Sequence, residues 1–359
     1  MSLILGIESS CDETAAAVVR DGKEVLSSAV ASQIAVHAPL GGVVPELAAR
    51  EHLKALEPVT REALSKAGVT PQEIDAVAVT QGPGLIPALL VGLSYAKGLA
   101  KNWNLPLIGV NHFMAHIYGA FLDGESDCLA DLSAYPMLAL VVSGGHSSLV
   151  LIDASGTARQ LGCTIDDAAG EALDKGSKLL NLGYPGGPAI SRAAEKGNAL
   201  AYNFPRPLTG GAGKPVPPEH RYNFSFSGIK TALLYHVRKL NLDGARALDE
   251  QELYDTAASF QLAVVDTLVK KTRQAVRDFK VKTVVLSGGV ACNALLRQMI
   301  QQELPGAVRV KIARPVYCTD NAAMVAGIAY HSFRQQDFIA PDADSYARLP
   351  GISRVPFIN

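Results

Sequence analysis

The fold depends on a stretch near the N-terminus that reads Leu3-Ile4-Leu5-Gly6-Ile7-Glu8-Ser9-Ser10-Cys11-Asp12-Glu13-Thr14-Ala15-Ala16-Ala17-Val18-Val19. Its apolar run from Leu3 to Ile7 predicts a short buried strand, and Ala15 to Val19 predicts a second strand. The residues between them, Glu8 to Thr14, are mostly hydroxylated or acidic and predict a polar turn. The stretch is therefore interpreted as a β-hairpin that presents polar side chains at its turn.

The same pattern recurs in the middle of the chain. The apolar run Met137 to Val142 leads into the small-residue turn Ser143 to Ser147, and Ser148 to Ile152 predicts the returning strand. A strand–turn–strand unit at the head of each of two halves favours a duplicated α/β fold. Hairpins are common, so one repeated pair alone would be weak support.

A third segment supports the repeat. Thr283 to Leu286 predicts a strand, Ser287-Gly288-Gly289-Val290 a glycine turn, and the stretch Ala294 to Leu304 a helix. Such a turn lets a ligand approach the backbone N–H groups at a helix start closely. Further strands are expected at 77–80 and 107–110. Helices are expected at residues 45–67, 86–101, 111–121, 168–181, 187–197, 249–279 and 320–336.

Composition excludes several classes of protein. The chain has 359 residues, 48% of them apolar and 19% charged, which is too apolar for disorder, and a net charge of −1 gives no global basic field. Its five cysteines form no CxxC pair, which favours reduced thiols. No signal peptide pattern and no apolar run of about 18 residues is present, so we expect a soluble, cytoplasmic protein.

His112 and His116 are the first candidate metal ligands. Their spacing of four places both imidazoles on one face of a helix, although an HxxxH pattern alone is more often structural. Phe113 stands where a zinc protease would have its catalytic glutamate. Asp320, just before a predicted helix, is the best third ligand, and its alternative role is that of an ordinary helix cap.

Other polar residues leave two readings open. Asp12 and Glu13 either solvate the first hairpin turn or handle a phosphate and a metal there. Glu171 and Asp174, one turn apart on a predicted helix, either bind ribose hydroxyls or form a solvated face with Lys175. The turn Tyr184 to Pro188 is either a base-binding backbone or an ordinary helix connection.

Taken together, these motifs resemble one known family. The matching segments, in the family's order, are Glu8–Thr14, Gly42–Arg50, Gln81–Gly84, Asn111–His116, Val142–His146, Asp167–Lys175, Tyr184–Gly187, Phe224–Gly228, Ser287–Val290 and Asp320–Ala322. The chain resembles the bacterial TsaD family of tRNA threonylcarbamoyladenosine transferases, formerly called glycoproteases, over about residues 3 to 335.

The resemblance implies a fold and a reaction. The fold is the duplicated, two-lobed α/β fold of actin, Hsp70 and the sugar kinases (the ASKHA fold). We expect one lobe from residues 1–110 with about 325–359, the other from 111–324, and a surface loop or insertion at 205–222. The implied enzyme is a metal-dependent acyltransferase that moves threonylcarbamoyl from L-threonylcarbamoyladenylate to N6 of adenosine 37 in tRNAs reading ANN codons (t6A modification), releasing AMP.

The resemblance also implies the site residues. One divalent ion, Fe²⁺ or Zn²⁺, would be held by His112, His116 and Asp320, and Asp12 and Glu13 would organise the reacting centre. The donor nucleotide, or ATP, ADP or AMP, would be bound by Val142, Ser143, Gly144, Gly145, His146, Glu171, Asp174, Gly187 and Asn293. The implied partners are tRNA, a TsaB-like paralogue that forms a heterodimer and a TsaE-like ATPase, with no membrane.

Two departures from the family pattern are visible. The loop from Thr209 to His220 is longer than usual, and it either contacts tRNA through Lys214, His220 and Arg221 or only fills a surface. Cys292 stands beside Asn293 where small residues are usual.

Three other functions compete. A small-molecule kinase or ATPase of the same fold would not need the histidine pair. A metalloprotease would need a general base. A nucleotide-sensing scaffold is distinguished only by binding without turnover.

Overall fold

The computed structural model describes residues 1–359 except 41, 125–128, 211–214, 241–247, 348–353 and 359. It divides into two compact units: unit 1 comprises Met1–Ala134, Asp153–Ala158 and Ala313–Asn359, and unit 2 comprises Tyr135–Ile152 and Arg159–Ile312. Residues 111–134 and 313–324 thus belong to unit 1, whereas the sequence-based division assigned them to the second lobe. The helices that carry them pack against each other, which keeps them in one unit.

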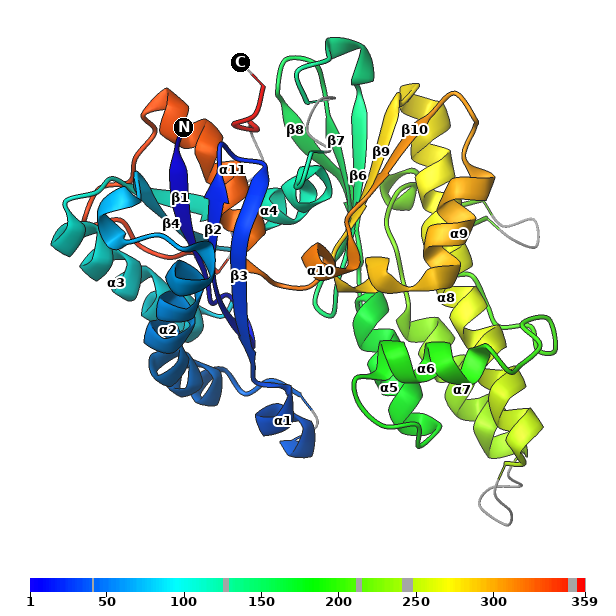
Figure 1. The fold of residues 1–359 in the computed structure, drawn as a ribbon. Coiled ribbons are helices and arrows are strands. Elements are labelled where there is room, and N and C mark those ends of the chain that lie inside the picture. The colour runs from blue at the N-terminus through cyan, green and yellow to red at the C-terminus, as the bar shows by residue number, and fades with distance from the viewer. Residues whose placement is uncertain (41, 125–128, 211–214, 241–247, 348–353, 359) are drawn as a thin grey trace. The chain divides into compact units, whose positions relative to one another are not determined.

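Unit 1 is built on a five-stranded sheet in the order β3-β2-β1-β4-β5 (Figure 1). Its strands are β1 Leu3–Glu8, β2 Glu13–Arg20, β3 Glu24–Ser32, β4 Ala76–Gly82 and β5 Leu107–Asn111. The predicted N-terminal hairpin is confirmed, because β1 pairs antiparallel with β2 from Leu3↔Arg20 to Glu8↔Ala15. On its other side β1 pairs parallel with β4, and β4 pairs parallel with β5.

Unit 2 repeats this topology. Its sheet has the order β10-β9-β6-β7-β8, which read from the other edge matches the order in unit 1 strand for strand. The strands are β6 Met137–Val142, β7 Ser147–Ile152, β8 Ala158–Cys163, β9 Thr283–Ser287 and β10 Arg309–Ile312. The antiparallel β6–β7 hairpin and the parallel β6–β9 and β9–β10 pairs also have counterparts in unit 1. The predicted duplication is confirmed.

Helices cover both faces of the unit 1 sheet. They are α1 Ile34–His37, α2 Pro45–Ala67, α3 Ile86–Trp103, α4 His112–Tyr118, α10 Pro315–Cys318 and α11 Ala322–Gln335. Leu5 and Ile7 of β1 lie in one apolar core with Leu56 of α2 and Leu93 of α3. Because side chains alternate along a strand, Gly6 faces the opposite side, where it meets α11.

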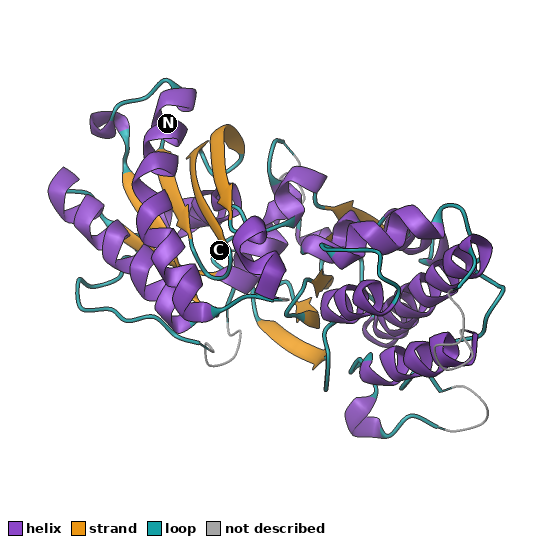
Figure 2. Cartoon of the chain, turned by 90° about the horizontal axis from the view of Figure 1, so that it is seen from below, coloured by secondary structure: helices purple, strands orange, loops and turns teal. Residues whose placement is uncertain are grey.

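The helices of unit 2 pack together, and Figure 2 shows several of them side by side. They are α5 Ala169–Leu179, α6 Gly186–Ala194, α7 Ser227–Leu240, α8 Glu250–Phe279 and α9 Ala294–Glu303. Helix α8 begins with a capping box between Asp249 and Glu252 and ends at Lys280 in the left-handed conformation.

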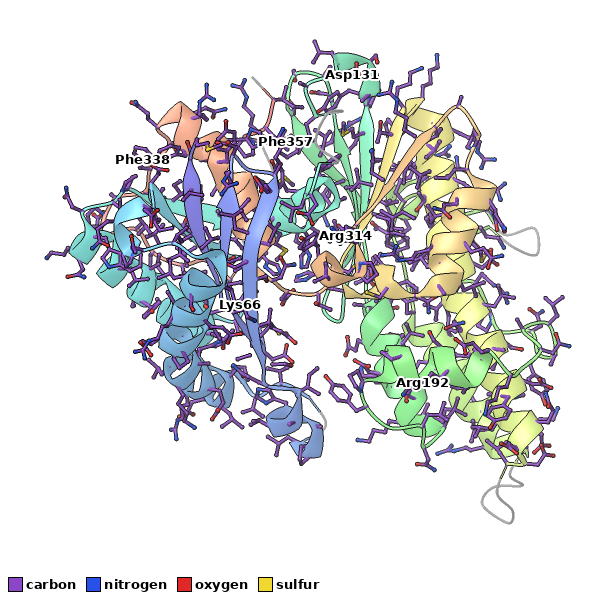
Figure 3. All side chains as sticks on the ribbon, in the orientation of Figure 1. Lys66, Asp131, Arg192, Arg314, Phe338 and Phe357 are labelled. Atoms are coloured by element: carbon purple, nitrogen blue, oxygen red, sulfur yellow. The ribbon has the colours of Figure 1, made fainter. Side chains whose placement is uncertain are left out.

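The C-terminal residues return to unit 1. The ring of Phe357, labelled in Figure 3, lies 5.9 Å from that of Tyr118 and 6.1 Å from that of His331, measured between centroids.

Among the described residues, no helix has the length and apolar character needed to cross a membrane.

Gly6 allows a close approach that we expect to be essential for stability. A Cβ at this position would lie 2.5 Å from the Ala322 carbonyl oxygen and 2.8 Å from the Ala326 nitrogen, both backbone atoms of α11. Gly6→Ala should therefore lower the free energy of unfolding by about 1–3 kcal/mol, as overpacking does. Chemical denaturation would measure this.

Gly98→Ala is the matched control. A Cβ at position 98 of α3 has nothing within 4 Å. Alanine there should leave stability unchanged or raise it by up to about 1 kcal/mol, since alanine favours helix over glycine. Equal stability of the two variants would mean that α11 does not constrain β1.

Candidate metal centre and nucleotide-binding residues

The two histidines lie one turn apart on α4, which begins directly after β5. The side chain of Asn111 caps this helix by accepting a hydrogen bond from the Met114 N–H at 3.1 Å. Asp320 lies just before α11, where Asn321 plays the same capping role toward Met324. Helices α4 and α11 pack against each other, so the loop before α11 brings Asp320 to the histidines.

The side chains of His112, His116 and Asp320 form a compact cluster. Nε2 of His116 lies 3.0 Å from Oδ1 of Asp320, and Nε2 of His112 lies 3.6 Å from the same oxygen. One ligand atom from each residue lies within 4.8 Å of the others. Both histidines are buried. Two imidazole nitrogens and one carboxylate oxygen are a donor set that suits a divalent transition metal, so the cluster fits such an ion.

Glu8 supports this cluster from behind. Its side chain is fully buried at the end of β1, and Oε2 lies 3.0 Å from Nδ1 of His112. Oε2 also accepts a hydrogen bond from the Thr80 hydroxyl at 2.6 Å, and Oε1 accepts one from the Ser10 N–H. A carboxylate on Nδ1 directs Nε2 toward a metal and raises its basicity. This arrangement therefore leaves Nε2 of His112 as the atom of that ring available to a metal ion.

The sequence patterns gave Glu8 no individual role. The available signal for Glu8 was an acidic residue at the end of an otherwise apolar strand, where burial requires a partner.

His116 differs from His112 at its other ring nitrogen. Within the described residues, Nδ1 of His116 is a buried nitrogen without a hydrogen-bond partner.

The charges around His112 determine its protonation in the metal-free protein. Burial of the ring opposes protonation, but the nearby carboxylates of Glu8 and Asp320 outweigh burial and raise the pKa of His112 to about 9. Burial alone would raise the pKa of Glu8. The charge of His112 and its hydrogen bond to Glu8 outweigh burial, so the pKa of Glu8 is lowered. A divalent cation at the cluster would take the place of that proton.

The acidic turn, which we define as Cys11 to Glu13, follows β1. Burial, and next the neighbouring charge of Asp12, raise the pKa of Glu13 to about 9, so Glu13 is protonated at neutral pH. Burial likewise raises the pKa of the Cys11 thiol, which keeps it from being a nucleophile. Glu13 accepts a hydrogen bond from the Ser32 hydroxyl at 3.3 Å.

The residues expected to bind a nucleotide all belong to unit 2. Val142 ends β6, and the Ser143 N–H donates to the His146 carbonyl at 2.7 Å across the turn. A Cβ at Gly144 or Gly145 would meet nothing within 4 Å, so the backbone of this turn is accessible from one side. Gly170, at the start of α5, approaches so closely that a Cβ there would lie 2.7 Å from the Ser143 carbonyl oxygen.

Asp174 joins α5 to α6. Its Oδ1 accepts a hydrogen bond from the Gly186 N–H at 2.7 Å, at the N-terminus of α6. The neighbouring Gly187 has open space at its Cβ position. Glu171 lies at the surface of α5 and pairs with Lys175 at 2.7 Å, so the solvated-face reading describes its contact in the structure.

Asn293 is a structural junction. Its Oδ1 caps α9 by accepting from the Leu296 N–H at 3.0 Å, and its Nδ2 donates to Ser191 and Gln261. The exposed Cys292 beside it does not disturb this cap. Asn293 thus holds α6, α8 and α9 around the glycine turn after β9.

The long loop is anchored where it is described. Residues 211–214, including Lys214, lie outside the described part. Nζ of the buried Lys271 donates to the carbonyls of His220 and Arg221 at 3.0 and 2.9 Å, and Arg221 pairs with Asp278. The loop thus ends in a fixed segment of unit 2.

The chain is similar to a known protein family, to curated relatives of that family and to solved structures. The family model "TsaD: tRNA N6-adenosine threonylcarbamoyltransferase" matches residues 24–327. A protein of that name from Trichlorobacter lovleyi is 50% identical over 355 residues, covering 98% of both chains. One from Thermomicrobium roseum is 46% identical over 367 residues, also covering 98% of both.

Two solved structures share the fold. Component A of (R)-2-hydroxyglutaryl-CoA dehydratase from Acidaminococcus fermentans has a TM-score of 0.53 at 16% identity, covering 92% of this chain and 98% of its own. HypF from T. kodakarensis has a TM-score of 0.55 at 16% identity, covering 94% of this chain and 48% of its own. With the repeated strand order, these likenesses confirm the predicted duplicated ASKHA-type α/β fold.

The raised pKa of His112 predicts how stability depends on pH in the metal-free protein. Protonated His112 stabilises the folded state fully below its ordinary pKa of 6.5, and this contribution is lost as pH rises through about 9. Glu8→Gln removes the nearest carboxylate, so the loss of unfolding free energy between these pH values should be smaller in the variant. Denaturant titrations at several pH values would measure it.

Glu13 does not confound this comparison. Its raised pKa also lowers stability as pH rises from 4.5 toward about 9, but it does so in both proteins. The surface variant Glu24→Gln serves as the control. Identical pH profiles for wild type and Glu8→Gln would show that Glu8 does not hold a proton on His112.

Proposed function

The chain belongs to the TsaD family of tRNA N6-adenosine threonylcarbamoyltransferases, and on this premise we propose that it works with a divalent metal held by His112, His116 and Asp320. The chain forms N6-threonylcarbamoyladenosine in tRNA. One observation carries the metal proposal: the Nε2 atoms of both histidines are directed at the same oxygen of Asp320.

The donor set suits Fe²⁺ or Zn²⁺. Three protein ligands leave coordination positions open, and a bound ion would supply Lewis-acid polarisation of donor oxygens. The protein's own contribution is to fix the ligands: Glu8 orients His112, and the helix caps Asn111 and Asn321 set the starts of α4 and α11.

We take the donor to be L-threonylcarbamoyladenylate and the acceptor to be adenosine 37 of tRNAs that read ANN codons, in the cytoplasm. In the transfer, N6 of the adenosine attacks the carbamoyl carbon, the bond from that carbon to the phosphate oxygen breaks, and AMP leaves. N6 gives up one proton. Because the anhydride is already activated, the enzyme's task is to position both substrates and accept that proton.

Asp12 and Glu13 have different parts in this scheme. In the metal-free protein the raised pKa of Glu13 keeps it protonated at neutral pH, which favours a role as hydrogen-bond donor over one as base. We assign the acceptance of the N6 proton, or the orientation of the amine, to Asp12.

We assign the nucleotide part of the donor, or ATP, ADP or AMP, to unit 2. The accessible backbone at Gly144, Gly145 and Gly187 can approach a phosphate or a base closely. Asp174 and Asn293 act there mainly by holding the helices α5, α6 and α9 in place. The Glu171 side chain is partly exposed, so its carboxylate can leave Lys175 and accept a hydrogen bond from a ribose hydroxyl.

The cluster of His112, His116 and Asp320 argues against a zinc protease and against a kinase of the same fold. Phe113 follows His112, and the carboxylate nearest His112, that of Glu8, is bound to its Nδ1, so it is not placed as the general base of a zinc protease. A kinase of the same fold has no use for a buried pair of histidines facing an aspartate.

The decisive assay measures t6A by mass spectrometry of tRNA nucleosides, together with metal bound per chain. His112→Ala, His116→Ala and Asp320→Ala should each lose bound metal and lower turnover by about 100-fold or more, because each removes a ligand. The exposed Asp342→Ala is the control. Variants that keep both metal and turnover would overturn the metal site, and wild type that binds nucleotide without forming t6A would favour the scaffold reading.

For partners, we propose a TsaB-like paralogue bound through α2 and α3, and a TsaE-like ATPase that acts on the complex. Helices α2 and α3 pack against each other and expose apolar side chains: Leu53 is 68% exposed and Leu90 is 41% exposed. Binding of a partner would bury these two leucines, which makes them the residues we expect in the contact.

Leu53→Glu should abolish heterodimer formation, because it places a charge in an apolar contact. Size-exclusion chromatography with the paralogue would measure it. Leu200→Glu, at a leucine of unit 2 that is 83% exposed, is the matched control and should leave association intact. If both variants associate like the wild type, the interface lies elsewhere.

A further inference from the structure

A chain of buried hydrogen bonds lies behind the acidic turn and takes no part in the functions assigned above. It consists of Thr14, Gln33, His37 and His52, all at most 4% exposed. Thr14 lies in β2, Gln33 directly follows β3, and His37 and His52 lie in α1 and α2. Buried polar side chains are costly unless each has a partner, so their directions can be worked out one by one.

His52 determines the first direction. Its Nε2 lies 3.1 Å from the Cys11 carbonyl oxygen, which can only accept, so Nε2 carries the hydrogen. Burial lowers the pKa of His52, which favours the neutral ring. Nδ1 is then an acceptor, and it faces the Thr14 hydroxyl at 2.7 Å and the Gln33 amide nitrogen at 3.4 Å.

Gln33 links the ring of His52 to that of His37. The amide nitrogen of Gln33 also donates to the Ala48 carbonyl at 3.3 Å, so its oxygen faces His37 and accepts from Nε2 of that ring at 3.0 Å. Nδ1 of His37 accepts from the Val44 N–H at 3.4 Å. Every donor meets an acceptor, and one tautomer of each histidine satisfies the chain.

Two residues of this hydrogen-bond chain, His52 and Gln33, donate to two consecutive carbonyls of the acidic turn. His52 binds the Cys11 carbonyl, and the backbone N–H of Gln33 donates to the Asp12 carbonyl at 3.0 Å. These two bonds fix the peptide groups on either side of the Asp12 Cα. The direction in which the Asp12 side chain leaves the backbone follows from them.

We propose that His52 is a positioning residue for threonylcarbamoyl transfer: its neutral ring, held by Thr14 and Gln33, fixes the Cys11 carbonyl and thereby the placement of Asp12. The proposal rests on the proposed function of Asp12. It differs from a purely structural role because it predicts a loss of turnover that exceeds any loss of stability and depends on one hydrogen bond.

Two substitutions separate the hydrogen bonds of His52. Glutamine is long enough to donate from its amide nitrogen to the Cys11 carbonyl, whereas asparagine keeps an acceptor for Thr14 but does not reach Cys11. With the complete enzyme system, His52→Asn should lower kcat by about 10- to 100-fold, as expected for a misplaced catalytic group, and leave KM for tRNA unchanged. His52→Gln should recover most of kcat.

Melting temperature and bound metal are measured for both variants. His236→Asn is the control, since that half-buried histidine bonds Thr256 in unit 2. Equal kcat losses in His52→Asn and His52→Gln, or losses that follow the melting temperatures, would overturn the positioning role.

A double-mutant cycle with Asp12→Asn separates the inference from its premise. If His52 acts through Asp12, His52→Asn should add little to the loss caused by Asp12→Asn. Full additivity would overturn the inference while leaving Asp12 in its role. An Asp12→Asn variant with normal kcat would instead overturn the proposed function of the turn, and with it the positioning role.

Discussion

The arrangement of the candidate metal ligands depends on the close approach of α11 to β1 at Gly6, where a Cβ would lie 2.5 Å from the Ala322 carbonyl oxygen. This contact places the start of α11, and Asp320 before it, beside the strand that ends in Glu8. Helix α4 packs on α11 and adds the histidines. Residues 104 and 204 positions apart in the sequence thereby hydrogen-bond to each other. The missing side chain of one glycine thus makes room for the cluster of His112, His116 and Asp320.

Around that contact the polar groups are ordered in layers. Nε2 of each cluster histidine faces Asp320, Glu8 lies behind His112, and the hydrogen bonds of His52 and Gln33 hold the neighbouring acidic turn. Glu8 restricts the orientation of the His112 ring, and the hydrogen bonds of His52 and Gln33 restrict the backbone of the acidic turn. Such preorganisation suits the transfer of a group from an activated donor to a weakly nucleophilic amine. Little covalent chemistry is then left for the protein, and its main task is to position the two substrates.

Sequence patterns predicted the central strands, the hairpins and most helices, because these elements carry long apolar runs or clear helical periodicity. The strands β3, β8 and β10 were not predicted, since they lie at sheet edges and carry polar residues such as Glu24, Arg159 and Lys311. The HxxxH spacing indicated the two histidines that the structure brings to Asp320. Glu8 and His52 escaped, because their roles arise from contacts with Thr80, His112 and Cys11 that only the tertiary structure brings together.

X-ray absorption spectroscopy at the edge of the metal in the purified protein tests the central claim most directly. We predict two imidazole ligands with nitrogen and oxygen donors only, one imidazole in His112→Ala and in His116→Ala, and no sulfur donor despite the neighbouring Cys11 and Cys318. A spectrum without imidazole scattering, or one unchanged in both variants, would contradict the account.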